Sequence, residues 1–553
     1  MQIRNHVQSI LEKACQQAGF SDVSVHLEHP QDMSMGDYAT AIAMQIGKKE
    51  GIKPTEVAGK IIACMDKDSY VDKVEVAGPG FINIYLSNDF FANVCRDKNY
   101  LLVQPLLAND HILVEHTSPN LFKPFHLGHL VNNFYGTAIA NLYRAVGAEV
   151  RETTFPSDIS PGIAKTVWAL KQKGWAHDFT IEQIGEAYAF GSEQYKESEE
   201  AKGEIDLINR ELYDGVQGEN YDIYERGKAL SFDYFTTTAR RLGTKHDSVV
   251  YESETEKIGK EIVKNNIGNI FTQSQGAVIF EGSKYGLFDN VFINSAGFGT
   301  YLTKDLGLIE RKSQLYPDIT QSVYVTDIEQ KQHFQLVKKA AELLDPGHAE
   351  RLVFLHHGRL SLTSGKISSR HGNVPLAEDL IDTVKETVVK KSAENDKRPS
   401  GEEAETIAQA ALRYAILKSS MGKNIVFDFE KDLALEGNTG PYLLYTYVRA
   451  RSIMEKAESS PREVHELQQI TALDKLLYRY PEIVMAAFEK KSPHEIATYL
   501  HELASEFNAF YASTMILDTD NPDYDHNLRL VVLLAEVLEK GLGILGIETV
   551  TKM

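Results

Sequence analysis

Residues 111–151 read HILVEHTSPNLFKPFHLGHLVNNFYGTAIANLYRAVGAEVR. The stretch opens with a short apolar, β-rich run and a polar turn. A long amphipathic segment follows over about 126–146 and stops at Gly147, a residue type favoured just after a helix. A second strand-like run covers 149–151. Strand, turn, helix and strand in this order predict a βαβ unit and therefore a parallel sheet.

Later segments extend the same sheet. Residues 322–326 are strand-like and precede helical spacing over 332–344, and 351–355 form another apolar strand. Between these two groups lies a charge-rich, mostly helical stretch from about 160 to 250. We therefore expect a doubly wound α/β domain over 109–385, with the helical stretch inserted between its two halves.

The N-terminal region, residues 1–108, predicts a small α+β domain. Its second helix is expected over 54–65, with Thr55 as a candidate N-cap. Two short strands are expected over 73–76 and 81–86, separated by a Gly-Pro-Gly turn.

The C-terminal region, residues 386–553, predicts an all-helical bundle. From about Ala404 the apolar positions recur at helical spacing, as they do over 442–454, 496–510 and 528–542. The chain is thus expected to hold three domains, which suits its 553 residues.

Composition limits the possible functions. The formal charge is −20, which argues against a protein that coats nucleic acid non-specifically, so an RNA partner must be argued from motifs. No apolar run approaches the ~18 residues needed to cross a bilayer. The N-terminus lacks the features of a signal peptide, and we expect a cytoplasmic protein with no membrane association.

The chain has three cysteines, Cys15, Cys64 and Cys95, and no CxxC spacing. An odd number of scattered cysteines disfavours a disulfide framework and a cysteine zinc site. We expect small buried apolar side chains and no protein-bound metal.

The sharpest chemical motif is His126-Leu127-Gly128-His129 at the start of the first helix of the βαβ unit. Two histidines three apart share one helix face, where their ring N–H groups and the helix N-terminus favour phosphate oxygens. Gly128 leaves room for a flat base against the backbone. The alternative is two surface histidines beside a turn glycine.

A second motif, Gly365–Asn373, reads GKISSRHGN and follows the last predicted strand. Lys366 and Arg370, with Ser368 and Ser369 between them, could clamp a polyphosphate. In isolation the segment could equally be a solvated basic loop.

This pair of motifs resembles the paired signatures of class I aminoacyl-tRNA synthetases, and the neighbouring residues resemble the arginyl-tRNA synthetase family. The segments that carry the resemblance are Glu115–His129 with its S-P-N and following lysine, Thr300–Asp305, Phe427-Asp428, Glu436–Tyr442, Gly541–Ile547, Gly36–Ala39 and Gly78–Asn83. The resemblance therefore runs nearly end to end. It implies a Rossmann-like catalytic domain with an added N-terminal domain and an anticodon-binding helical bundle.

The resemblance implies a two-step reaction. The carboxylate of L-arginine attacks ATP to give an arginyl-adenylate, and the terminal ribose of tRNA(Arg) then takes the arginyl group. Because the nucleophile is already ionised, catalysis rests on positioning and on charge stabilisation. The implied catalytic groups are Lys123, His126, His129 and Lys366. ATP contacts are expected at His126, Gly128, His129, Lys366, Ser368 and Ser369, with Mg²⁺ on the phosphates.

The loop departs from the family pattern at two positions, one of which is Arg370-His371-Gly372 where R-K-G is usual. Ser369 stands where such loops commonly carry a second lysine. Lys123 is expected to compensate, with Arg370 as a weaker candidate.

The resemblance also implies a pocket for the guanidinium, which carboxylates with bidentate geometry bind best. The family acid in T-Y-L-T-R-D falls on Asp305, the aromatic on Tyr301, and a second acid aligns with Glu252. Asn120 and Gln330 resemble the residues that hold the substrate's own polar groups. The alternatives are a helix-start acid for Asp305 and a plain surface charge for Glu252.

Contacts with tRNA are expected from two domains. Phe81 and Asn83 resemble residues that touch the tRNA elbow. Tyr442 and Arg449 offer aromatic and cationic groups to unstacked bases, although bundle tyrosines can equally be core. The resemblance further implies a monomer that needs tRNA for the activation step.

One motif differs from the family. Ser157-Asp158-Ile159-Ser160 replaces the usual G-D-W-G, so any role of those glycines is in doubt. Three other readings remain open: a class I synthetase for another amino acid, a small-molecule nucleotidylyltransferase, and a tRNA-binding relative without activation chemistry. The chain has no zinc-ligand cysteines and no room for an editing domain, which argues against a synthetase for another amino acid. Its helical C-terminus argues against a small-molecule nucleotidylyltransferase.

Overall fold

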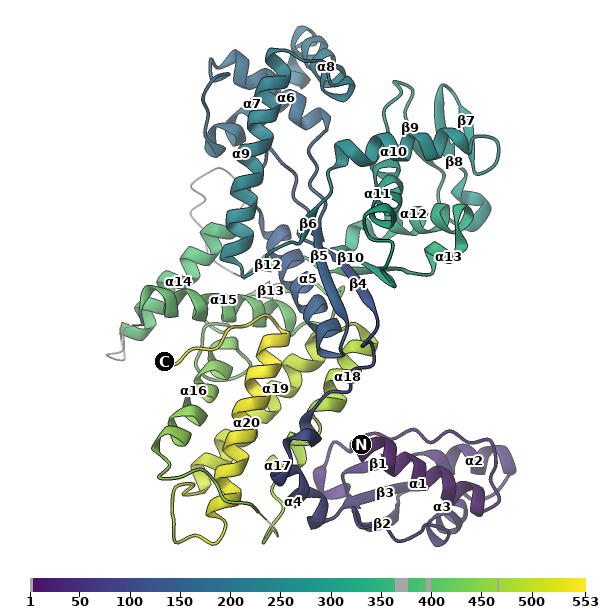
Figure 1. The fold of residues 1–553 in the computed structure, drawn as a ribbon, viewed down its shortest axis with the longest axis vertical. Coiled ribbons are helices and arrows are strands. Elements are labelled where there is room, and N and C mark those ends of the chain that lie inside the picture. Colours follow the sequence, from purple (N-terminus) through teal and green to yellow (C-terminus); the bar gives the residue numbers. More distant parts are fainter. Residues whose placement is uncertain (1–2, 364–375, 394–398, 465–466) are drawn as a thin grey trace.

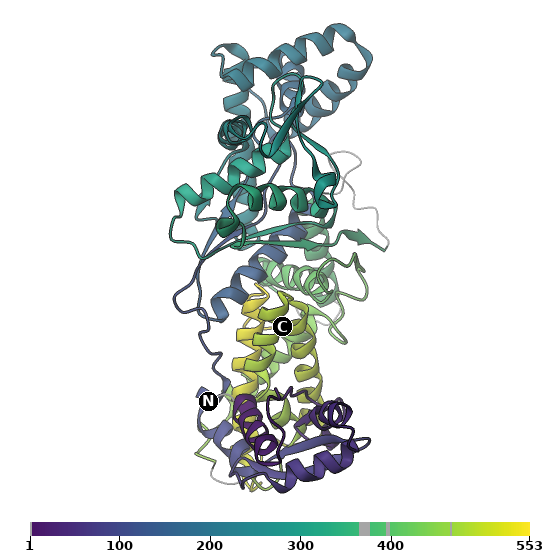
Figure 2. The same ribbon diagram turned by 90° about the vertical axis from the view of Figure 1, so that its right-hand side faces the viewer.

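A computed structural model describes residues 3–363, 376–393, 399–464 and 467–553. The molecule is elongated, with the helical insertion at one end of its long axis, the parallel sheet near the middle, and the C-terminal helices beyond it (Figure 1). The N-terminal domain lies at the far end beside those helices (Figure 2).

The central sheet is parallel throughout and has the strand order β11-β10-β4-β5-β6. Its strands are β4 (His111–Glu115), β5 (Glu149–Thr154), β6 (Ser248–Val249), β10 (Gln321–Asp327) and β11 (Leu352–His357). Helix α5 (Leu127–Ala145) connects β4 to β5, so the predicted βαβ unit is confirmed. The chain returns on the other side of β4 as β10, which makes the gap between β4 and β10 a topological switch point.

The predicted helical insertion is present, and its helices enclose an apolar core of their own. Its helices are α6 (Pro161–Gln172), α7 (Ile181–Glu197), α8 (Glu199–Asp214) and α9 (Glu219–Arg241). Helix α9 leads back to the sheet edge at β6.

A second inserted unit was not predicted from the sequence. It holds a small antiparallel sheet of order β7-β8-β9 between two helices that pack closely on each other. Its elements are α10 (Glu252–Asn265), β7 (Phe271–Ser274), β8 (Ala277–Phe280), β9 (Asn290–Ile293) and α11 (Tyr301–Leu315). Helices α12 (Lys331–Leu344) and α13 (Pro346–Ala349) follow β10.

The N-terminal domain packs helices on a three-stranded antiparallel sheet of order β1-β3-β2. Its elements are α1 (Ile3–Gln17), β1 (Tyr38–Thr40), α2 (Ile42–Glu50), α3 (Pro54–Ala63), β2 (Val71–Ala77), β3 (Phe81–Leu86) and α4 (Asn88–Arg96). The expected N-cap at Thr55 is wrong. Pro54 is already helical and Lys53 takes the cap position, because the fixed φ of proline suits the first helical residue.

Within the described ranges, the end of the catalytic domain and the C-terminal region are helical except for one pair of short strands. Its elements are β12 (Leu360–Leu362), α14 (Ala377–Ala393), α15 (Gly401–Leu417), β13 (Ile425–Phe427), α16 (Gly440–Lys456), α17 (Ala472–Leu477), α18 (Tyr480–Lys490), α19 (His494–Ser513) and α20 (Tyr524–Ile544). Strand β13 pairs in parallel with β12, so the expectation of helix alone after Ala404 is wrong. Three residues paired with a distant segment leave no periodic signal in the sequence.

The described residues also include four short 3₁₀ segments: η1 (Met33–Met35), η2 (Lys98–Leu101), η3 (Gly282–Tyr285) and η4 (Ile328–Gln330). One apolar core runs through the N-terminal domain, α5 and the C-terminal helices. Helices α15, α18 and α20 all contact α5 directly, so the bundle supports the helix that begins at the histidine motif. Within the described residues, every helix is too short or too polar to span a bilayer.

Candidate active site

The two motif histidines stack on each other at the N-terminus of α5. Their ring centroids are 3.8 Å apart, with 20° between the planes. His126 is the N-cap, and its Nδ1 accepts the backbone N–H of Gly128 at 3.1 Å. Nδ1 of His129 accepts the backbone N–H of His126 at 3.3 Å. Both Nδ1 atoms act as acceptors, so in neutral rings the proton resides on Nε2.

Electrostatics keep these rings neutral. Burial lowers the pKa of His126, and the nearby Lys123 ammonium lowers it further. Burial and the neighbouring His126 hold the pKa of His129 well below its usual range. Two neutral rings therefore offer Nε2–H donors at a helix N-terminus, an arrangement suited to phosphate oxygens.

Gly128 and Lys123 complete the helix start. A Cβ at Gly128 would lie 2.9 Å from the His126 ring, so the cap geometry itself requires glycine. Nζ of Lys123 lies over the Tyr188 ring of the helical insertion, 4.5 Å from its centroid. Lys123 is therefore close enough to affect His126 and is held by a cation–π contact. Lys366, Ser368, Ser369 and Arg370 lie outside the described residues.

Glu252 begins α10 and is 5% exposed, so the surface-charge alternative is wrong. Its Oε2 accepts the Ser157 hydroxyl at 2.8 Å and the Lys304 ammonium at 2.6 Å. Burial raises the pKa of Glu252, whereas Lys304 and Ser157 act to lower it. Lys304 also donates to the carbonyl of Ile159 at 2.8 Å.

Asp305 and Tyr301 lie on the first turns of α11. Oδ2 of Asp305 is 2.5 Å from Nε2 of His333 on α12. Asp305 also acts electrostatically on Glu252, which shows that the two acids lie near each other. Tyr301 is 55% exposed, and Nζ of Lys304 lies 5.2 Å from its ring centroid. The expected pocket residues from α10 and α11 are thus brought together.

Asn120 and Gln330 lie at the carboxyl ends of neighbouring strands. Asn120 follows β4 and forms a bridge with Ser157 after β5, and Gln330 ends η4 directly after β10. Both are exposed. Ligands of open α/β sheets bind at this edge, and the histidine motif begins at the same edge.

The Ser157–Ser160 segment packs against the start of α10. Asp158 is fully buried, with Oδ2 accepting from Lys228 at 2.6 Å and from the Ser253 hydroxyl at 2.7 Å. Its Oδ1 accepts the backbone N–H of Ser253 at 2.9 Å, which holds the start of α10 against this segment. Reasoning from sequence missed Asp158, Lys228, Lys304 and His333 as parts of the site. Asp158 and Lys304 lie within quoted motifs, whereas no sequence motif pointed to Lys228 or His333.

The tRNA candidates divide into three half-buried residues, Phe81, Tyr442 and Arg449, and one buried residue, Asn83. Phe81 begins β3 and is half-buried, whereas Asn83 is 3% exposed within the sheet. On α16, Arg449 lies between the Tyr445 and Tyr511 rings, 4.7 and 4.8 Å from their centroids. Asn508 on α19 links Tyr442 to Arg449. It donates to Tyr442 Oη and accepts from the Arg449 guanidinium.

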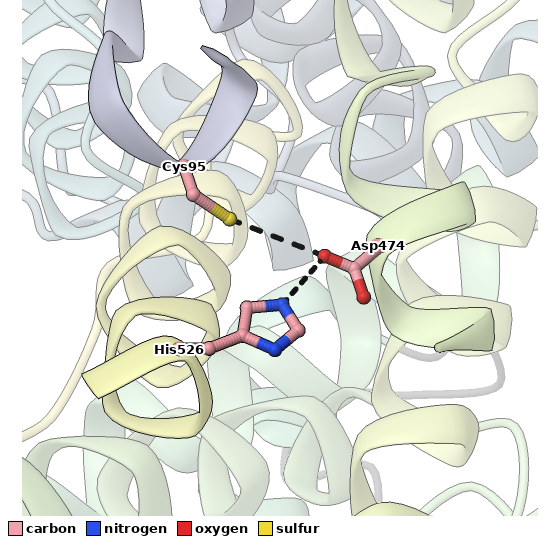
Figure 3. Close-up of side chains that lie close together, drawn as sticks. All are labelled: Cys95, Asp474 and His526. Atoms are coloured by element: carbon pink, nitrogen blue, oxygen red, sulfur yellow. Dashed lines mark hydrogen bonds and ion pairs between the residues drawn. The ribbon is translucent and has the colours of Figure 1, made fainter. Parts of the chain in front are cut away.

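One further cluster, drawn in Figure 3, lies between α4, α17 and α20, far from the candidate site along the long axis (Figure 1). Cys95 on α4, Asp474 on α17 and His526 on α20 are all buried, and each directs one ligand-type atom toward the others. Nε2 of His526 is 2.9 Å and Sγ of Cys95 is 4.0 Å from the same Asp474 oxygen. Burial raises the pKa of the Cys95 thiol, so the thiol stays protonated and donates a hydrogen bond. In this state the three residues form a hydrogen-bonded junction between α4, α17 and α20.

The sheet, its switch point and the histidine motif define a class I aminoacyl-tRNA synthetase. Residues 93–431 match the family described as tRNA synthetases class I (R), catalytic domain. Residues 1–86 match the Arginyl tRNA synthetase N terminal domain, and residues 443–553 match the DALR anticodon binding domain.

Individual relatives agree with these matches. The chain is similar to Arginine--tRNA ligase of Flavobacterium psychrophilum, with 31% identity covering 86% of this chain and 85% of the relative. The protein of that name from Shewanella sp. strain MR-4 is 29% identical, with 100% of both chains covered. Among solved structures, Thermus thermophilus arginyl-tRNA synthetase shares the fold with a TM-score of 0.81, 23% identity and 100% coverage of both chains. The chain belongs to the arginyl-tRNA synthetase family.

Proposed function

We propose that this chain activates L-arginine with ATP and transfers the arginyl group to the terminal ribose of tRNA(Arg), releasing pyrophosphate and AMP. One observation carries the proposal: the phosphate-type donors of α5 and the carboxylates of α10 and α11 gather at the carboxyl edge of one parallel sheet. A reaction between an anionic triphosphate and a cationic amino acid needs the phosphate-binding donors and the carboxylates at one place.

In the first step, the arginine carboxylate attacks the α-phosphorus and pyrophosphate leaves. No residue has to remove a proton, because the attacking carboxylate is already ionised. His126 and His129 donate Nε2–H to phosphate oxygens, and Lys123 and Lys366 add positive charge as charge moves onto the leaving group. Gly128 admits the adenine side of ATP, and Ser368 and Ser369 bond to the phosphates. Mg²⁺ enters with the ATP phosphates as part of the substrate.

Selection of arginine rests on Asp305 and Glu252. Their carboxylates accept the N–H groups of a planar guanidinium, and the Tyr301 ring provides a face for it. Asn120 and Gln330 hold the α-amino and carboxylate groups of the substrate. A lysine substrate offers fewer donors and would leave buried acceptors unpaired, so its discrimination reaches about 10²-fold or more.

Recognition of tRNA is divided between the two flanking domains. We assign residues 1–108 to an elbow-contacting domain, residues 109–385 to the catalytic domain and residues 386–553 to the anticodon-binding domain. Phe81 belongs to the first surface, whereas Asn83 is buried in β3 and is not available for contact with tRNA in this structure. Tyr442 and Arg449 belong to the last, where the Arg449 guanidinium between two aromatic rings supports stacking on unpaired bases.

We propose a monomer that acts in the cytoplasm and needs tRNA for amino-acid activation. The test is pyrophosphate exchange with each of the twenty amino acids, with and without tRNA. Arginine alone should support exchange, and only when tRNA is present. Exchange with a different amino acid overturns the substrate assignment, and strong exchange without tRNA overturns the tRNA requirement.

A further inference from the structure

We propose that Ser157 and Lys304 are a coupled pair of positioning residues that hold Glu252 by one oxygen and turn its other oxygen toward the substrate guanidinium. The inference rests on the proposed function, because it places Glu252 in the arginine pocket. It concerns a serine after β5 and a lysine on α11, and the expected site residues include neither.

The contacts define the orientation of the carboxylate. The Ser157 hydroxyl and the Lys304 ammonium both donate to Oε2 of Glu252, at 2.8 and 2.6 Å. Two donors from separate elements fix one oxygen and thereby the plane of the carboxylate. Neither of these two contacts uses Oε1, so Oε1 can accept a guanidinium N–H.

Charge explains why a permanent cation is needed here. The side chains of Glu252 and Lys304 are 6% and 4% exposed, and a buried carboxylate without a cation favours its protonated form. A neutral acid would bind a guanidinium weakly. Burial lowers the pKa of Lys304, but Glu252 and two tyrosines outweigh it, so the ammonium stays charged. Burial raises the pKa of Glu252, and the Lys304 ammonium at 2.6 Å counters that effect in favour of the ionised carboxylate.

The donor count links Lys304 to Ser157. Lys304 uses one N–H for Glu252 and one for the Ile159 carbonyl, and the second donor to Glu252 comes from Ser157. An arginine at position 304 would bring a planar fork with two donors to the carboxylate, and it would compete with the serine hydroxyl. Serine thus suits lysine, whereas glycine suits arginine. Ser157 stands where the family motif has glycine, and Lys304 stands where it has arginine. These two departures meet at one oxygen of Glu252.

The test is a double-mutant cycle with Ser157→Gly, Lys304→Arg and the combined variant. Arginylation of tRNA is measured while arginine and ATP are varied in turn. Each single variant should raise the KM for arginine about tenfold, which is the size of one lost hydrogen bond to a charged group. The KM for ATP should stay within about twofold, and the double variant should return to within about threefold of the wild type.

Two controls separate positioning from general damage. Ser157→Thr keeps the hydroxyl and should keep the arginine KM, whereas Ser157→Ala should behave like Ser157→Gly. Lys228→Arg makes the same change at a neighbouring buried ion pair with Asp158. Because Lys228 does not donate to Glu252, its effect should add to that of Ser157→Gly without rescue.

The outcomes are distinguishable. An active wild type with additive single variants, or with single variants that leave the arginine KM unchanged, overturns the inference and leaves the proposed function standing. A wild type that shows no arginine-dependent activity overturns the proposed function and this inference with it. If Lys304→Arg does not fold alone, recovery of folding in the double variant, measured by thermal unfolding, supports the coupling, and its failure overturns the coupling.

Discussion

Two buried carboxylates, Glu252 and Asp474, lie in different parts of the molecule and are used differently. Glu252 in the catalytic domain receives both of its side-chain donors on one oxygen, and one donor is a lysine. Asp474 at the junction of the N-terminal and C-terminal domains has both oxygens engaged. One accepts from His526 and Cys95 (Figure 3). The other accepts from the hydroxyl and backbone N–H of Thr471.

The difference teaches how burial alone fails to identify a functional acid. Both carboxylate oxygens of Asp474 accept hydrogen bonds from protein groups, and these bonds join α4, α17 and α20. A ligand would therefore have to displace a protein contact. Glu252 keeps acceptor capacity next to a strand edge where substrates bind. A buried carboxylate with an available acceptor and a fixed plane is suited to binding, whereas a saturated one is suited to holding domains together.

The largest expected effect is that of Asp305→Asn. This change keeps the shape of the side chain and removes its charge, so the guanidinium loses a charged partner in a partly buried pocket. We expect the KM for arginine to rise about 10²- to 10³-fold, equivalent to about 3–4 kcal/mol. The KM for ATP should change by less than about threefold, as measured by tRNA-dependent pyrophosphate exchange.

A matched control tests the location of this effect. Glu254 lies two residues from Glu252 on α10 but is half-exposed and pairs with Arg311 at 3.4 Å. Glu254→Gln should leave both KM values unchanged. Equal losses for arginine and ATP in Asp305→Asn would remove Asp305 from the pocket.

The second-largest expected effect is on stability, at the junction of α4, α17 and α20 that Asp474 holds together. Asp474→Asn should lower the free energy of unfolding by about 2–3 kcal/mol, because it weakens several hydrogen bonds to one buried charge. The KM for arginine should stay unchanged, since the site is in another domain. Urea unfolding and arginine kinetics measure the two quantities, and the exposed Asp520→Asn serves as the control. A changed arginine KM would contradict the separation of the two regions.

Regular features could be predicted from the sequence, and long-range contacts could not. The bounds of α5 were predicted within one residue, because its apolar spacing is continuous and Gly147 adopts a φ of +95° after it. Strands β7 to β9 have four residues each, too few for a clear alternation. The parallel sheet followed from βαβ order, but the inserted antiparallel sheet had no comparable rule.

The candidate site shows the same limit. His126 and His129 were found because they belong to one motif on one helix. The contacts of Glu252 with Ser157 and Lys304 join residues 95 and 52 positions apart, and only the fold brings them together. Cys95, Asp474 and His526 come from three separate helices, so no spacing in the sequence could connect them.

A smaller effect is expected from pH at the histidine pair. Folding lowers the pKa of both His126 and His129 from the usual value of 6.5, so the unfolded chain binds more protons at low pH. Their contribution to stability is complete above pH 6.5 and is lost as the pH falls below it. Melting temperatures across this range should fall more steeply for the wild type than for His126→Asn, which keeps an N-cap but cannot titrate. Parallel curves would contradict this assignment.

The smallest effect is that of Cys95→Ala at the junction. The change removes a weak S–H donor and one buried sulfur, so the free energy of unfolding should fall by only about 1 kcal/mol. His526 still donates to Asp474 at 2.9 Å, so the Asp474 carboxylate keeps its main partner. Thermal unfolding with and without EDTA completes the test, because a hydrogen-bonded node does not respond to a chelator. If EDTA lowers the melting temperature of the wild type but not that of Cys95→Ala, these three residues are a cation site. Glu252 and Asp474 would then both be ligand-binding carboxylates.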